Sequence, residues 1–461
     1  MNNKLFKIKN KIYIFFKNKD IFSINFFIIS FGILFFLFLK INILFSFYFT
    51  VSLIGLMYVM KRVKHTMAKQ YLYVSFIYFI VSIILIKINF AGILGYQDQY
   101  FYIEESVNLL SKSEEYGNIV NSFLFATHQF NFNNWSFIHY INDYIFQNTQ
   151  AILFFNFNFY FIVIVYTWKT FKHIFISEKV RFYFFTFMLF SFPILFINSL
   201  YLKESFYSSL LLLLFSSLKN KNIFLIALSS FFLVKIRLSY FILIILIALF
   251  FRIIFSVKKR MKIIIFSVII GIGIIGINYI STLGNTGIKL IDYFNQSSSG
   301  GSVAKVEKLQ NFSMKFIDKE NLLSIQNIIV IPVAGLFSPP AIRFLKVRDL
   351  RTIIESLMVS MWWWIGLPYF FIFILELVKK DYKLSSYVLG IFLSIYLASS
   401  FSLITIAPEI FRYRLSLFGL FLLGIFIGTY WYKDNKRLLY KRIIKLWFYG
   451  SGSLYLLYLI K

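Results

Sequence analysis

Long apolar runs are the feature of this sequence that most constrains its fold. Several stretches of about 18 residues or more carry few or no charges, and this is the length that a helix needs to cross roughly 30 Å of hydrocarbon. Hydrophobic residues make up 59% of the 461 positions and charged residues only 15%, whereas a soluble domain has roughly 25% charged residues. The sequence therefore predicts an integral membrane protein.

The runs predict an all-α, polytopic membrane protein with about 12 transmembrane helices (about 11 to 13), and residues 1–461 read as a single membrane domain. A last run, near 446–460, is short and either crosses the membrane or lies in its interface. The expected spans lie near residues 21–39, 41–60, 70–88, 150–168, 182–200, 204–218, 222–236, 239–257, 263–281, 357–378, 385–406 and 414–432.

Lysine and arginine mark one side of the membrane. The first twenty residues are rich in lysine and lack a small-residue cleavage site, so we interpret them as a retained cytoplasmic tail. If the spans alternate from a cytoplasmic N-terminus, the basic segments 61–69, 169–181, 258–262 and 433–445 all face the cytoplasm. This distribution accounts for the net charge of +29 without nucleic acid as a partner.

Two long segments then lie on the outer face as periplasmic loops. The first, 89–149, is acidic and includes Asp98 and Asp143. The second, 282–356, ends in a stretch at 342–356 where basic residues such as Arg343 alternate with apolar ones, which predicts an amphipathic helix at the interface. Loops of this length are usually functional or disordered.

Topology leaves one group of charges unexplained, at the outer ends of the spans. Charge near the bilayer is costly and usually faces a cavity or a pathway, and clustered cations suit a phosphate or pyrophosphate ligand. Each could instead be a local ion pair or an anchor to lipid headgroups. The group comprises Asp98, Lys203, Glu204, Lys235, Arg237, Arg412 and Arg414.

Two cation pairs in this group are separated by two positions. Residues two apart on a helix point about 200° apart, so Lys235 and Arg237 cannot both face one cavity from a regular helix. Either the backbone is broken there, or only one of each pair binds a ligand; the same holds for Arg412 and Arg414.

Other residues have more ordinary interpretations. The run Trp362–Trp364 is typical of an aromatic belt at the membrane interface, and His128 and His139 in the first loop are more often structural than catalytic. Cysteine is absent and the four histidines lack a metal-ligand spacing, so the sequence predicts neither a metal site nor a cofactor.

The motifs around these charges resemble those of bacterial polysaccharide polymerases, the Wzy-type O-antigen or oligosaccharide repeat unit polymerases. The resemblance covers roughly residues 90–430 and depends on short, degenerate motifs. These are Phe192-Pro193 through Lys203-Glu204, then Lys235-Ile236-Arg237, the late Phe411-Arg412-Tyr413-Arg414, and Asp98 with Tyr100–Tyr102.

The resemblance implies a metal-independent glycosyltransferase without a cofactor, on the outer face of the bacterial inner membrane. It would transfer a growing glycan from undecaprenyl pyrophosphate onto an incoming lipid-linked repeat unit. Its partners would be that lipid-linked oligosaccharide and membrane lipid, with a chain-length regulator and a flippase as further candidates. The second loop departs from related enzymes because it contains no histidine.

The expected roles follow from charge. Cations would bind the pyrophosphate and stabilise the charge that builds on it as it leaves, Arg412 most directly. Asp98, Glu204 or a loop histidine would accept the proton of the acceptor hydroxyl. The expected pyrophosphate ligands are Lys203, Lys235, Arg237, Arg343, Arg412 and Arg414.

Two other functions remain open. A glycosyltransferase that uses polyprenyl-phosphate sugars would place a catalytic acid in its first outer loop, where Asp98 could serve. A flippase for lipid-linked oligosaccharides would need cations deep in a central cavity, whereas the unexplained charges of this sequence lie near one face.

Overall fold

The computed structural model describes a discontinuous part of the chain. Two expected spans (21–39 and 263–281), most of both outer loops and most of the expected amphipathic helix at 342–356 lie outside it. The described residues are 52, 54–59, 63, 65–88, 102–104, 106–107, 134–146, 150–256, 345, 353–354, 357, 360–405, 414–435 and 437–460.

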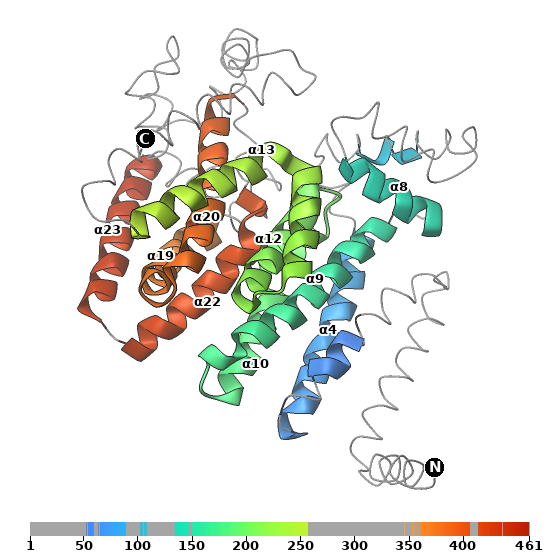
Figure 1. The fold of residues 1–461 in the computed structure, drawn as a ribbon, viewed down its shortest axis with the longest axis horizontal. Helices are drawn as coiled ribbons and strands as arrows, with labels where there is room; N and C mark the ends of the chain where they lie inside the picture. The colour runs from blue at the N-terminus through green and yellow to red at the C-terminus, as the bar shows by residue number, and fades with distance from the viewer. Residues whose placement is uncertain are drawn as a thin grey trace.

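All regular elements of this part are helices, so its fold is all-α as expected (Figure 1). They are α4 (His65–Ile88), α8 (Asn134–Phe146), α9 (Ala151–Phe171), the 3-10 helix η1 (Lys172–Ile174), α10 (Glu178–Phe190), α11 (Phe192–Asn198), α12 (Lys203–Asn220), α13 (Ile223–Ser256), α19 (Met361–Lys380), α20 (Tyr382–Thr405), α22 (Phe418–Asn435) and α23 (Leu438–Ile460).

Three of the described helical segments are long and apolar enough to cross a membrane: Met67–Ile88, Ala151–Ile174 and Met361–Lys380. A fourth joins α10 to α11, which bend by 41° between Phe190 and Phe192. Pro193 explains this break, because proline is tolerated in the first turn of α11 but could not continue α10. These helices are consistent with a membrane protein, and the full number of about 12 spans stays a prediction.

Helix α12 lies at the centre of the described bundle and packs against α9, α13, α20 and α22. Its middle turns are buried on all sides, and its long run of leucines supplies core contacts to each neighbour. A helix that is apolar all round is expected in such a position. The central position of α12 fixes where its first turn, with Lys203 and Glu204, lies relative to the other helices.

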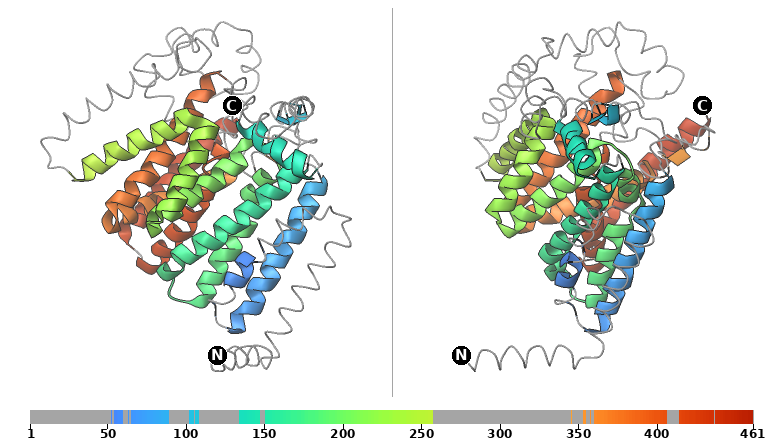
Figure 2. Two further views of the ribbon diagram at one scale, coloured as in Figure 1. Left: turned by 45° about the vertical axis from the view of Figure 1, so that its right-hand side comes forward. Right: turned by 90° about the vertical axis from the view of Figure 1, so that its right-hand side faces the viewer.

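Helix α13 covers the two spans expected at 222–236 and 239–257. Its residues Ile223–Ser256 form two helical arms that meet at a kink at Arg237, whose backbone is non-helical (φ −151°, ψ 80°). The two arms of α13 meet at a bend at the same end of the bundle as α8 (Figures 1 and 2). The second arm packs along α20, where Gly390 permits close approach because a Cβ there would lie 2.6 Å from the Ile244 carbonyl oxygen.

The short run expected at 446–460 belongs to the longer helix α23, which lies along α19. Near one end of α19, Glu376 accepts hydrogen bonds from Arg437 (2.8 Å) and Tyr440. Near the other end, the Trp364 indole donates to the Ser451 hydroxyl (2.6 Å). Because these contacts lie at opposite ends of a membrane-crossing helix, α23 runs antiparallel to α19 along most of its length.

Candidate functional site

A buried ion pair joins the first turn of α12 to the break in α13. Arg237 donates from Nη2 to Oε1 of Glu204, and the two side chains are 9% and 0% exposed. The non-helical backbone at Arg237 redirects its side chain relative to a regular helix, which allows it to reach α12. Both residues were predicted from the sequence as part of one charged cluster, and the structure brings them together.

Lys235 and Arg237 occupy different surroundings. Lys235 is exposed, with Nζ 5.9 Å from the centre of the Phe231 ring on its own helix. The Arg237 guanidinium lies 4.8 Å from the centre of the Tyr240 ring, and Tyr240 packs edge-on against Tyr207 of α12. The broken backbone and the separation of the two cations, which the sequence left as alternatives, occur together here.

Part of the first outer loop packs against the start of α12. Lys203 lies with Nζ 5.8 Å from the centre of the Tyr102 ring. In α8, the Trp135 indole stacks on Phe206 of α12 and donates to the Tyr201 carbonyl (2.8 Å). These contacts place loop side chains at the end of the bundle where the Glu204–Arg237 pair lies.

Asp143 of α8 is the functional candidate that the sequence analysis did not single out. Its carboxyl is buried, and the Ser106 hydroxyl donates to Oδ2 (2.6 Å). The other oxygen, Oδ1, has no hydrogen-bond partner among the described residues. Burial raises the pKa of Asp143 to about 6, a value suited to accepting a proton near neutral pH.

His139 lies one turn before Asp143 but is poorly suited to proton transfer. Its ring is fully buried, against Trp135 (5.1 Å between ring centres), Tyr201 (5.9 Å) and Tyr102 (6.3 Å). Burial lowers the pKa of His139 to about 3, so the ring is neutral near pH 7. Its environment supports the structural role expected for it.

The spacing of the buried residues in α8 could have identified Asp143. Trp135, His139, Asn142 and Asp143 recur at the interval of one helical face, and all are buried. Helix α8 was not recognised from the sequence, so this helical spacing was not used. Asp143 was therefore counted only as one of several acidic residues in the loop.

Arg414 is the other buried cation at this end of the bundle. It is 1% exposed, and its guanidinium lies 4.5 Å from the centre of the Trp363 ring. Trp363 itself is 2% exposed and stacks on Phe392, Tyr396 and Phe421. The aromatic-belt interpretation is therefore wrong for Trp363, which belongs to the core; hydropathy cannot distinguish a tryptophan facing lipid from one facing a neighbouring helix.

The starts of α12 and α22 are in direct contact. The Gly419 amide donates to the Ser208 hydroxyl (2.8 Å), and a Cβ at Gly419 would lie 3.0 Å from the Ser208 carbonyl oxygen. Ser208 lies one turn after Glu204, and Gly419 lies shortly after Arg414. This contact brings Arg414 to the same end of the bundle as the Glu204–Arg237 pair.

Three residues predicted for the site, Asp98, Arg343 and Arg412, lie outside the described residues. Within the described ranges, no group of three or more His, Cys, Asp or Glu side chains is arranged to hold a metal ion. The described part of the site thus contains the ion-paired carboxylate of Glu204 and the buried carboxyl of Asp143, whose Oδ1 has no hydrogen-bond partner among the described residues. Its cations are Lys203, Lys235, Arg237 and Arg414.

Comparison of the chain with protein-family models, with curated proteins and with solved structures finds no match. The resemblance to polysaccharide polymerases therefore depends on the short motifs alone, and function must be argued from the site.

Proposed function

We propose that this protein is a polysaccharide polymerase, a metal-independent glycosyltransferase with about 12 spans and a cytoplasmic N-terminus. It transfers a growing glycan from undecaprenyl pyrophosphate to a lipid-linked repeat unit on the outer face of the bacterial inner membrane. The observation that carries the proposal is the buried Glu204–Arg237 ion pair at the break in α13, with Lys203 and Arg414 at the same end of the bundle.

The cations suit a departing pyrophosphate. When the acceptor oxygen bonds to the anomeric carbon, the bond from that carbon to the pyrophosphate oxygen breaks and its electron pair stays on the pyrophosphate. Arg237 and Arg414 are largely buried, and a fixed cation stabilises developing charge more strongly where water is excluded. Lys203, half-buried beside them, supplies a further donor.

The two carboxyl groups have different roles in this proposal. Glu204 accepts from Arg237 and orients the guanidinium fork, so it acts as a positioning residue. Asp143, with its open oxygen and a pKa of about 6, accepts the proton of the acceptor hydroxyl. This assignment replaces Glu204 and the loop histidines as the expected base, and leaves Asp98 as an alternative.

The position of the buried cations favours an enzyme over a flippase. A flippase needs cations along a central path through the membrane, whereas Arg237 and Arg414 both lie where helices begin or break at one end. A polyprenyl-phosphate-sugar glycosyltransferase remains the nearest enzymatic alternative, and a requirement for a divalent cation would distinguish it.

Reconstitution tests the proposal. Purified protein in liposomes receives a repeat unit linked to undecaprenyl pyrophosphate, with EDTA present and no nucleotide sugar, and products are separated by size. A ladder of increasing glycan length is the expected result. Transfer of the intact lipid-linked unit to the other leaflet, without a ladder, would contradict the proposal and indicate a flippase.

A further inference from the structure

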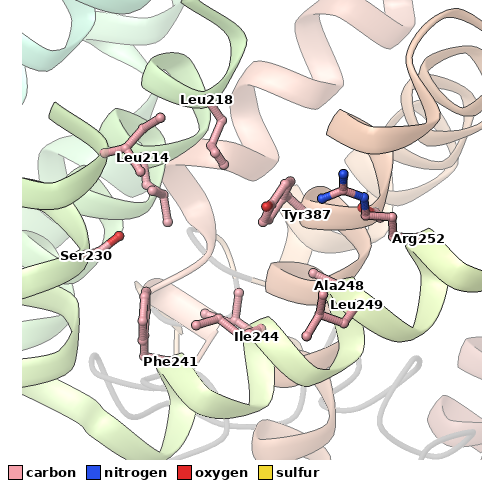
Figure 3. A pocket seen from close by; sticks show the side chains of 12 residues that line it. Leu214, Leu218, Ser230, Phe241, Ile244, Ala248, Leu249, Arg252 and Tyr387 are labelled. Atoms are coloured by element: carbon pink, nitrogen blue, oxygen red, sulfur yellow. The ribbon is translucent and has the colours of Figure 1, made fainter. Parts of the chain in front are cut away.

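An apolar cavity lies between the two arms of α13, α12 and α20, apart from the charged site described above (Figure 3). Its volume is about 220 Å³. The walls are apolar: Leu214 and Leu218 come from α12, and Phe241, Ile244 and Ala248 come from the second arm of α13. Two serines and Tyr387 add hydroxyl groups, but no acidic residue lines the cavity.

The packing of the second arm explains why this space is open. Gly390 and Ala248 hold the second arm tightly against α20, while the first arm packs on α12. Side chains from the two arms face each other across the space that remains. Ile245 and Leu249 form part of its lining and are 39% and 47% exposed, so the cavity opens to the surroundings of the bundle along an apolar rim.

One cation lies at the end of this cavity. Arg252, near the C-terminal end of α13, is exposed and lines the cavity beside Tyr387 of α20 (Figure 3). The end of α12 meets the start of α20 at this same level, where Lys219 pairs with Asp381 (3.7 Å). The polar end of the cavity therefore coincides with the ends of several helices, where the membrane interface is expected.

The length of the cavity matches one membrane leaflet. Phe241 and Arg252 lie eleven positions apart on one helix, which corresponds to roughly 16 Å at about 1.5 Å per residue. The hydrocarbon core is roughly 30 Å thick, so one leaflet contributes about half of that. An apolar groove of this length with a cation at its interfacial end has the shape and polarity of a phospholipid.

We propose that this cavity and its rim bind an anionic phospholipid of the leaflet nearest Arg252. The lipid phosphate lies on the Arg252 guanidinium, and one acyl chain lies along the groove toward Phe241. A polyprenyl pyrophosphate substrate is a poorer occupant, because the buried cations Arg237 and Arg414 lie at the other end of these helices. The lipid site depends only on the membrane setting of the helices and is independent of the polymerase proposal.

Native mass spectrometry of the full chain in detergent tests the site. The delipidated protein is titrated with phosphatidylglycerol or with phosphatidylcholine of the same acyl chains. We expect about fivefold tighter binding of the anionic lipid, since one basic side chain near a membrane surface contributes about that factor. Arg252→Gln removes this preference and leaves phosphatidylcholine binding unchanged, while Ser230→Phe, which fills the groove, weakens both.

Arg442→Gln is the matched control, because Arg442 is also an exposed arginine but lies on α23 and does not line the cavity. If Arg442→Gln and Arg252→Gln lose the preference for phosphatidylglycerol over phosphatidylcholine equally, the preference comes from general surface charge and the proposal is overturned. An Arg252→Gln protein that keeps the full preference for phosphatidylglycerol would also overturn it. Displacement of phosphatidylglycerol by an added polyprenyl phosphate, absent in Ser230→Phe, would instead assign the groove to a polyprenyl chain and contradict it.

Discussion

Glu204 and Arg237 form an ion pair with almost no exposure to solvent. Removing one partner of a buried ion pair costs about 3–5 kcal/mol because it leaves an uncompensated buried charge, whereas removing both charges leaves none. We therefore expect Glu204→Gln and Arg237→Gln each to destabilise the protein strongly, and the double variant to recover most of that loss. Thermal unfolding of the four proteins in detergent measures this coupling, and additive losses would show that the pair is not a unit.

Asp143 should make stability depend on pH. Its pKa is raised from 3.8 to about 6, so the folded state binds the proton more tightly than the unfolded state does. The contribution of Asp143 to stability therefore falls as pH rises from about 4 to about 6, by up to about 3 kcal/mol. The neighbouring His139 opposes this fall over much of the same range, because its pKa is lowered to about 3 in the folded state and the unfolded state therefore binds that proton more tightly. The contribution of Asp143 is therefore measured as the difference between two proteins that both keep His139.

Asp143→Asn should remove this contribution, so the stability of the wild type relative to Asp143→Asn should fall as pH rises from 4 to 7 in unfolding measurements. In the reconstituted polymerase reaction, the wild-type rate should rise as pH increases through about 6, because only the ionised carboxyl accepts a proton. The Asn variant should be folded but nearly inactive across this range. A variant with the wild-type rate profile would exclude Asp143 as the base.

At single residues, the sequence predicted which charged side chains belong to the site better than it predicted which of them contact each other. Charges placed at the outer ends of spans suggested Lys203, Glu204, Arg237 and Arg414 as a cluster, because burial of charge is costly enough to require a reason. It could not predict that Glu204 pairs with Arg237, since that pairing depends on a backbone break at Arg237. Asp143 was missed because its burial depends on docking of α8 against α12.

At the scale of elements, close helix contacts depend on glycine. A Cβ at Gly428 of α22 would lie 2.0 Å from the Tyr369 carbonyl oxygen of α19, whereas a Cβ at Gly450 of α23 would meet nothing within 4 Å. We expect Gly428→Ala to destabilise the bundle by about 1–3 kcal/mol through overpacking. Gly450→Ala should be neutral or stabilise by up to about 1 kcal/mol, because alanine is the better helix former.

Melting temperatures of these two variants in the same detergent measure the difference. A Gly428→Ala protein as stable as Gly450→Ala would mean that α19 and α22 do not approach each other as closely as this structure shows.

The sequence predicted helices more successfully than their connections. Apolar runs located α4, α9, α12, α19, α20 and α22 to within a few residues, because hydropathy reports each helix by itself. It also divided α13 into two helical segments at the right place, because Lys235 and Arg237 resemble a polar turn and the backbone breaks at Arg237. It left α23 undecided because three basic residues, Lys441, Arg442 and Lys445, interrupt its apolar pattern, and its packing along α19 could not be inferred from composition.

At the scale of the whole molecule, the absence of cysteine allows a clean test of topology. Val107 lies in the first outer loop and is 49% exposed, while Ile176 lies in a segment expected to be cytoplasmic and is 82% exposed. A membrane-impermeant maleimide should label Val107→Cys in intact cells with a permeable outer membrane. Ile176→Cys should react only after the inner membrane is disrupted; the opposite pattern would invert the orientation and place the site on the cytoplasmic face.

The central claim is that the Glu204–Arg237 pair serves the transfer of glycan from pyrophosphate. The most direct test is the initial rate of ladder formation in liposomes by the Glu204→Gln/Arg237→Gln double variant, with Arg442→Gln as the control. Because the double variant removes both charges together, it leaves no unpaired buried charge, and we expect a folded protein. Its rate should fall by about 100-fold or more, the usual effect of losing a transition-state donor, while the control keeps the wild-type rate. A folded double variant that forms the ladder at the wild-type rate would contradict the account.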